Sequence, residues 1–98
     1  MIVVRNVFQL KFGKAKEAMA LMKESTGILQ RQGEPIPRYL TDLTGPFYTL
    51  VMELSYDNLA ALEKSQKESM SSKEFGEWYQ RFIPLVESGH RELYTVIS

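Results

Sequence analysis

Residues 39–56, YLTDLTGPFYTLVMELSY, decide the fold of this chain. They read as two strands around a tight break at Thr44-Gly45-Pro46, with the second strand predicted over Phe47–Ser55. Because successive side chains of a strand point to opposite faces, both faces of this strand carry apolar groups and both need a cover. The chain's own helices can cover one face, and a second copy of the protein is expected to cover the other. The apolar or aromatic positions of the strand are Phe47, Tyr48, Leu50, Val51, Met52 and Leu54.

The stretches on either side supply the rest of a small α+β fold. Asp57 is expected to cap a helix that runs to about Glu68, and the Ser-x-x-Glu spacing at 71–74 is expected to start another. Gly89 is expected to end that last helix before the final strand. Alternation of apolar residues predicts the other strands, and a 3.6-residue period predicts the first helix. These remaining elements are strands at 2–12, 38–43 and 91–98 and a helix at 14–32.

The element order is β-α-β-β-α(α)-β, which is the plan of a ferredoxin-like fold with a four-stranded antiparallel sheet. The helices then lie on one face of the sheet, and residues 1–98 form a single domain. First and third strands are neighbours in this fold, so Arg5 is expected to pair with Glu53 on the face away from the helices. An apolar face left in water usually marks an interface. The residues expected on that face are Val3, Val7, Phe47 and Val51.

The composition of the chain excludes several function classes. Twelve basic and twelve acidic residues give no net charge, so there is no basic footprint for nucleic acid and no polybasic run for an anionic membrane. No apolar stretch approaches the roughly 20 residues that span a bilayer, so no membrane partner is expected. With no cysteine there is no disulfide framework and no thiol nucleophile. A cytoplasmic location is the expectation that fits these features.

Three stretches carry a resemblance to a known family. They are LKFGK at 10–14, TGPFYTLVMELSYDNLAALEK at 44–64 and FGEWYQRFIPLVESGHRELYTV at 75–96. In this order they resemble the NIPSNAP-like domains of the dimeric α+β barrel superfamily. The chain departs from the family pattern twice: Phe12 precedes the Gly-Lys turn where proline is usual, and Asn6 stands where a first-strand arginine is often found.

The resemblance implies a homodimer with back-to-back sheets and a small-molecule pocket between helices and sheet. The preferred hypothesis is therefore a homodimer that binds a small hydrophobic molecule there and needs no cofactor. The superfamily also includes antibiotic-biosynthesis-type (ABM) monooxygenases and muconolactone isomerase-like proteins. The alternative hypothesis is thus a cofactor-independent monooxygenase or isomerase acting on an aromatic small molecule. Whether the protein is an enzyme stays open at this point, since the matching motifs mark turns and the ends of helices and strands and contain no known catalytic residues.

Three candidate ligand residues fall on strands that face the helices. Asn6 lies on an otherwise apolar face, where a polar group must find a hydrogen-bond partner. It is either a satisfied core residue or a pocket residue directed at a ligand. Tyr48 and Met52 are expected to share its face.

Three further candidates lie on other elements. Trp78 either lines an aromatic pocket or packs its helix on the sheet, as apolar helical stripes normally do. His90, the single histidine, is either a general base or ligand group, or a surface residue near a helix end. Arg38 either holds a ligand carboxylate or solvates an edge strand. A lone histidine without a cluster of other ligands predicts no metal site.

Overall fold

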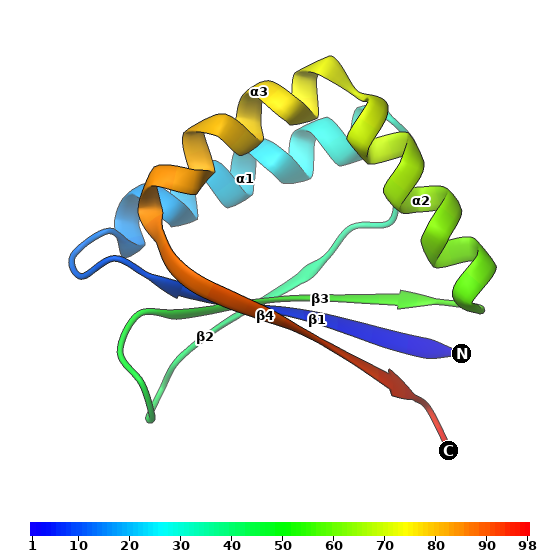
Figure 1. The fold of residues 1–98 in the computed structure, drawn as a ribbon, viewed down its shortest axis with the longest axis horizontal. Helices are drawn as coiled ribbons and strands as arrows, with labels where there is room; N and C mark the ends of the chain where they lie inside the picture. Colours follow the sequence, from blue (N-terminus) through cyan, green and yellow to red (C-terminus); the bar gives the residue numbers. More distant parts are fainter.

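The computed structural model describes residues 1–98 and has the architecture that the element order predicts (Figure 1). Four strands form one antiparallel sheet, and three α-helices lie on one side of it. In chain order the elements are β1 (Ile2–Leu10), α1 (Ala15–Arg31), β2 (Arg38–Thr41), β3 (Thr49–Tyr56), α2 (Leu59–Ser71), α3 (Lys73–Phe82), a 3₁₀ turn η1 (Ile83–Leu85) and β4 (Val86–Thr95).

The strands are ordered β2-β3-β1-β4, so β1 and β3 are neighbours in the middle of the sheet, as predicted. Their register pairs Arg5 with Glu53 and Val7 with Val51. On the helix side, Leu50 of β3 is fully buried and Met52 nearly so. The even-numbered side chains of β3 therefore face the helices, and the odd-numbered ones face away.

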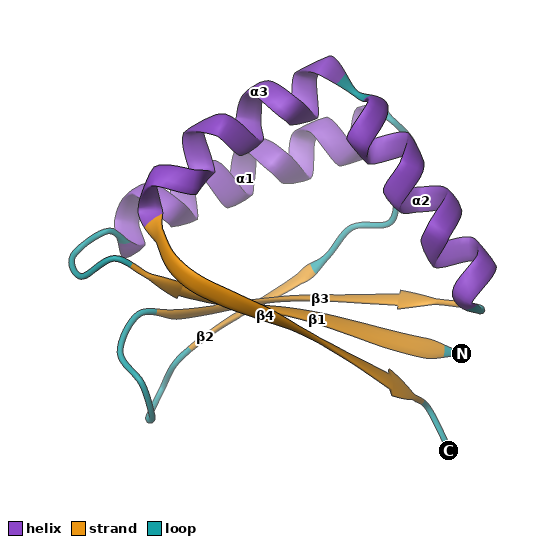
Figure 2. Ribbon diagram, in the orientation of Figure 1, coloured by secondary structure: helices purple, strands orange, loops and turns teal.

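The core has a larger and a smaller part. The larger part packs α1 and α3 on the middle of the sheet and contains Met22, Leu50, Trp78 and Phe82. The smaller part lies at the other end, where Val4 and the third-strand terminus meet α2. Burying a core side chain of this size contributes about 1.5–3 kcal/mol, so these contacts fix the helical layer on one face. Figure 2 shows the opposite face of the sheet without any covering element.

The last strand begins earlier than predicted. β4 starts at Val86 and runs through Gly89, because Pro84 ends the third helix in a 3₁₀ turn and the next residues pair with β1. Gly89 is thus a strand residue and does not end the helix. A Cβ atom at Gly89 would lie 3.1 Å from the ring of Phe8 and 3.2 Å from the carbonyl oxygen of Val7, so a side chain there would force the ring or the backbone to shift.

The helix starts are each displaced by one residue. Asn58, not Asp57, caps α2, and its side-chain oxygen accepts from the backbone N–H of Ala61 at 2.9 Å. Ser72 caps α3, while Ser71 remains the last residue of α2 and donates back to its own helix. Adjacent polar residues are equally good N-cap candidates in the sequence. Only the backbone geometry decides which side chain reaches the free N–H groups of the first helical turn.

The hairpin between β2 and β3 has a longer loop than predicted, covering 42–48. Gly45 has a φ of +104° and Tyr48 has a φ of +60°, so neither residue continues an extended strand. The carboxylate of Asp42 accepts from the backbone N–H of Thr49 at 2.9 Å and closes the loop. Tyr48 therefore lies just before β3, in a conformation that a bulky residue rarely adopts.

Candidate functional site

Trp78 and Met52 are packed inside the core between the helices and the sheet. Trp78 is 2% exposed, and its indole N–H donates to the carbonyl oxygen of Leu21 in α1 at 2.7 Å. The indole stacks on Phe82, with 5.2 Å between the ring centroids. A stacked indole whose N–H is bonded in this way holds α3 against α1.

Asn6 lies on the helix-facing side of β1 and is half-buried. Its side-chain oxygen accepts from Nε of Arg91 at 3.0 Å. The two residues lie directly opposite each other in the pairing of β1 with β4. The polar group on this apolar face is thus satisfied by an arginine of the neighbouring strand, which the sequence did not indicate as its partner.

His90 and Arg38 lie on the outer face of the sheet, away from the helices. His90 is opposite Val7 in the register and its Nε2 lies 3.2 Å from a carboxylate oxygen of Glu92. It is in the middle of β4 and not beside a helix end. Because adjacent strand residues point to opposite faces, His90 and Asn6 do not line one pocket.

Tyr48 stands apart from the other candidates, in the loop before β3. Its ring packs edge-on against Phe12, with 4.6 Å between centroids, and it touches the margin of the larger core. The structure therefore brings Trp78, Met52 and Tyr48 to one hydrophobic core and leaves Asn6 at an open part of the sheet. His90 and Arg38 are on the other side.

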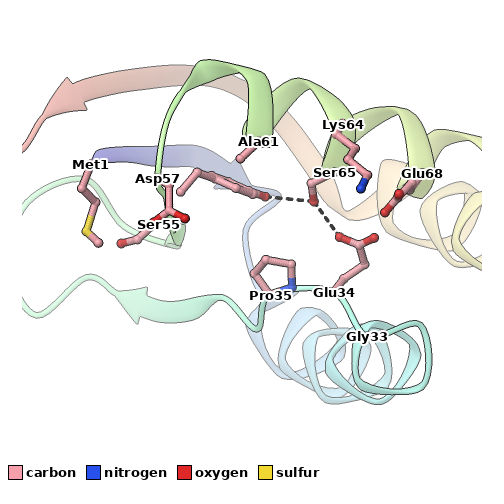
Figure 3. Close-up of a pocket in the computed structure, with 11 residues that line it drawn as sticks. Met1, Gly33, Glu34, Pro35, Ser55, Asp57, Ala61, Lys64, Ser65 and Glu68 are labelled. Atoms are coloured by element: carbon pink, nitrogen blue, oxygen red, sulfur yellow. Dashed lines mark hydrogen bonds between the residues drawn. The ribbon is translucent and has the colours of Figure 1, made fainter.

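A cavity of about 340 Å³ lies between the loop after α1, the end of β3 and the start of α2 (Figure 3). Only three of its eleven lining residues are hydrophobic. A polar lining of this kind suits a polar molecule better than the hydrophobic one expected for the pocket between helices and sheet. The lining residues are Met1, Gly33, Glu34, Pro35, Ser55, Tyr56, Asp57, Ala61, Lys64, Ser65 and Glu68.

A chain of hydrogen bonds crosses this cavity from the sheet to the loop (Figure 3). The hydroxyl of Tyr56 donates to Oγ of Ser65 at 3.3 Å, and Ser65 donates to a carboxylate oxygen of Glu34 at 2.7 Å. Tyr56 is buried, whereas Ser65 and Glu34 are half-buried. The chain therefore links the end of β3 to the loop through one residue of α2.

Glu34 and Glu68 form a carboxylate pair at the same cavity. A hydrogen bond with Glu34 raises the pKa of the exposed Glu68 carboxyl, helped by some loss of hydration and by the nearby negative charge of Glu34, while Lys64 opposes the shift. A neighbouring carboxylate favours the protonated form of a carboxyl group, so Glu68 holds its proton to higher pH than an isolated glutamate does. No three histidine, aspartate or glutamate side chains lie close enough together to hold a metal ion.

The residues of this cavity were missed in the sequence because they come from separate elements. Glu34 is in a loop, Tyr56 ends a strand, and Ser65 and Glu68 lie one turn apart on α2. The only local signal was the spacing of Ser65 and Glu68, which places them on one helix face.

A row of alternating charges crosses the outer face of the sheet. The row contains one residue from each strand, in the order Arg38, Glu53, Arg5 and Glu92, and each is paired in the register with the next. Glu53 accepts from Nε of Arg5 at 2.8 Å and from Arg38 at 2.7 Å, which confirms the predicted pair with Arg5. The bond from Arg5, joined by that from Arg38, outweighs burial and lowers the pKa of Glu53.

The row ends in a small polar cluster on β4. The guanidinium of Arg5 lies 5.4 Å from the ring centroid of Tyr94, and Tyr94 donates to Glu92 at 3.1 Å. Hydrogen bonds from His90 and then Tyr94 lower the pKa of Glu92. The arginine near the aromatic ring and the shared carboxylate order these side chains on a face that no other element covers.

None of the three helices is long and apolar enough to cross a membrane. A comparison with curated proteins found no match. Among solved structures, the chain is similar to a NIPSNAP family protein from Agrobacterium tumefaciens, at 21% identity and a TM-score of 0.83, with 96% of this chain and 90% of that chain covered. An uncharacterized NIPSNAP-like domain protein from Burkholderia xenovorans gives 18% identity and a TM-score of 0.88 over 99% of this chain and 85% of that one.

A third similar structure is named an antibiotic biosynthesis monooxygenase, at 16% identity and a TM-score of 0.74, with 100% of both chains covered. At these identities the likeness shows a shared fold alone. The family comparison goes further, because the model of the NIPSNAP family matches residues 4–98 and so spans nearly the whole chain. It confirms the resemblance carried by the three sequence stretches, and the chain belongs to the NIPSNAP family.

Proposed function

We propose that this NIPSNAP protein acts as a single-domain homodimer, paired through the outer faces of two sheets, that binds a small polar molecule in the cavity beside α2. The observation that carries the dimer is the uncovered outer face. Val3, Val7, Val51 and Leu40 lie on it, and none is fully buried within one chain. An apolar sheet face of this kind is stable when a second sheet covers it.

The alternating row of charges suits pairing with a second copy. A two-fold axis along the strands, through the middle of the sheet, reverses the row in the partner copy. Arg38 then faces Glu92 of the partner subunit, and Glu53 faces Arg5 of the partner subunit. Every position thereby meets an opposite charge, which favours this arrangement over one in which like charges meet.

The dimer is tested by Val51→Lys, at the centre of the outer face. In the monomer the lysine reaches water, but in the dimer it becomes a buried, unpaired charge that costs several kcal/mol. Light scattering should show a dimer for the wild type and a dissociation constant raised by about a hundredfold or more for the variant. The matched control is Leu59→Lys, an exposed leucine on α2 that should leave the dimer intact.

A wild-type monomer at micromolar concentration, or a Val51→Lys variant as dimeric as the control, would sink the dimer proposal. Circular dichroism of both variants establishes that the fold is retained, so that a loss of the dimer is not a loss of folding.

The ligand is supported by the cavity and its hydrogen-bonded lining from Tyr56 to Glu34. Native mass spectrometry of protein purified from its host reports dimer mass and any retained molecule together. We expect an added mass in the wild type that disappears in Ser65→Leu, because the leucine side chain takes up part of the cavity and the substitution removes the central hydroxyl. An added mass retained in Ser65→Leu would contradict this site.

The catalytic alternative, a cofactor-independent monooxygenase or isomerase, has less support. It requires Asn6, Tyr48, Trp78 and His90 around one roomy pocket. Trp78 is enclosed in the core and His90 projects from the opposite face to Asn6. The proposal therefore includes no reaction. The proposal also includes a cytoplasmic location, which fits the composition of the chain described above.

A further inference from the structure

Arg91 is the one arginine of the five in this chain whose side chain has no carboxylate partner. The other four each lie within 4 Å of a glutamate carboxylate oxygen and form an ion pair with it. Arg91 is bonded to an amide instead, through Nε and the side-chain oxygen of Asn6. A neutral acceptor leaves the positive charge uncompensated. The four paired arginines are Arg5, Arg31, Arg38 and Arg81.

The bond to Asn6 fixes the direction of the guanidinium. Asn6 sits in the middle of β1, held by pairing to β3 on one side and β4 on the other, so its backbone is fixed and its side-chain oxygen is a positioned acceptor. Because the bond uses only Nε, the two terminal nitrogens of Arg91 keep their N–H groups free of protein acceptors. A planar, anchored fork of this kind matches the two oxygens of a carboxylate.

The surroundings of Arg91 are open and apolar. Leu93 lies two residues further along β4 on the same face and is 45% exposed. In the other direction Gly89 has no side chain and borders the ring of Phe8. The neighbouring carboxylate, Glu92, points to the outer face and is engaged by His90 and Tyr94. No second lysine or arginine lies on this face of β1 or β4. A single cation beside apolar surface matches a monoanion better than a phosphate dianion.

We propose that Arg91, positioned by Asn6, binds the carboxylate of a small organic acid whose apolar body lies along Leu93 and Phe8. This site goes beyond the cavity beside α2, and it shares no residue with that cavity. It also assigns a role to the polar group that the sequence places on an apolar strand face.

The test uses octanoate, below its micelle-forming concentration, and octanamide as its uncharged counterpart. Titration is followed by NMR of the ¹⁵N-labelled dimer, including the Nε–H signals of the arginines. Octanoate should shift the Arg91 Nε–H signal and the amides around Asn6 and Leu93. Octanamide should bind about tenfold more weakly or worse, because it has no negative charge and cannot form an ion pair with the guanidinium.

Two variants separate the charge from the fold. Arg91→Gln removes the cation, and Asn6→Asp keeps it but supplies a carboxylate within the chain that competes with the ligand. Both should weaken octanoate binding about tenfold or more, while Arg31→Gln, an exposed arginine paired with Glu74, should not change it. Amide spectra of all three should retain the wild-type pattern away from the replaced residue.

Three outcomes would overturn the proposal. Octanoate shifts confined to the residues beside α2 would overturn the Arg91 site and leave the cavity proposal standing. Equal binding of octanoate and octanamide would show that the charge plays no part. A dimer weakened by Arg91→Gln in light scattering would show that a carboxylate of the partner copy, and not a free acid, occupies Arg91.

Discussion

Replacing Trp78 with phenylalanine tests whether this residue packs the core. The indole is 2% exposed, and its N–H donates to Leu21 at 2.7 Å. Losing that hydrogen bond costs about 1 kcal/mol. The missing part of the indole leaves a cavity, and because complete removal of a buried tryptophan costs about 3–5 kcal/mol, the partial loss contributes about 1–2 kcal/mol. We expect a total destabilisation of about 2–3 kcal/mol, a large part of the 5–15 kcal/mol typical of small domains.

The assay is urea unfolding followed by far-UV circular dichroism, since Trp78 is the single tryptophan and the variant has no indole fluorescence. Wild type and variant are compared at one protomer concentration, because the stability of the proposed dimer depends on concentration. Tyr79→Phe on the same helix is the control, at 47% exposure, and should change the free energy of unfolding by less than about 0.5 kcal/mol. A loss in Trp78→Phe no larger than in the control would refute the packing role.

Glu53 and Glu68 should give opposite pH dependences. The lowered pKa of Glu53 means that its contribution to stability is present above the ordinary glutamate pKa, about 4.3, and is lost as pH falls through the pKa of the folded state. In urea unfolding at several pH values, the free energy of unfolding of Glu53→Gln should therefore fall less steeply at acid pH than that of the wild type. The raised pKa of Glu68 means that its contribution to stability is present below the ordinary glutamate pKa and is lost as pH rises through the pKa of the folded state. Glu68→Gln should thus be at least as stable as wild type at pH 7. A marked loss of stability of this variant at pH 7 would contradict the raised pKa. Gly89→Ala should destabilise the protein by about 1–3 kcal/mol in thermal or urea unfolding, because its Cβ meets the Phe8 ring at 3.1 Å; a neutral result would mean that the ring moves freely.

The sequence determined the element order and the faces of the central strands. The change of hydrophobic period from two to 3.6 residues is a local property, and so are the prolines and glycines that interrupt it. The alternation within Phe47–Ser55 predicted correctly that Leu50 and Met52 face the helices and that Glu53 meets Arg5 on the other side. Three stretches that carry turns and the ends of helices and strands were sufficient to indicate the family that the comparison confirms.

Only the tertiary structure decided which polar groups come together. Asn6 and Arg91 are neighbours through the pairing of the first and last strands, and His90 lies on the other face because the register places it opposite Val7. Glu34 and Glu68 meet across a loop and a helix whose relative position depends on the packed core. Periodicity assigns a side chain to a face, but distance between elements follows from register, strand start and packing, which no local pattern encodes.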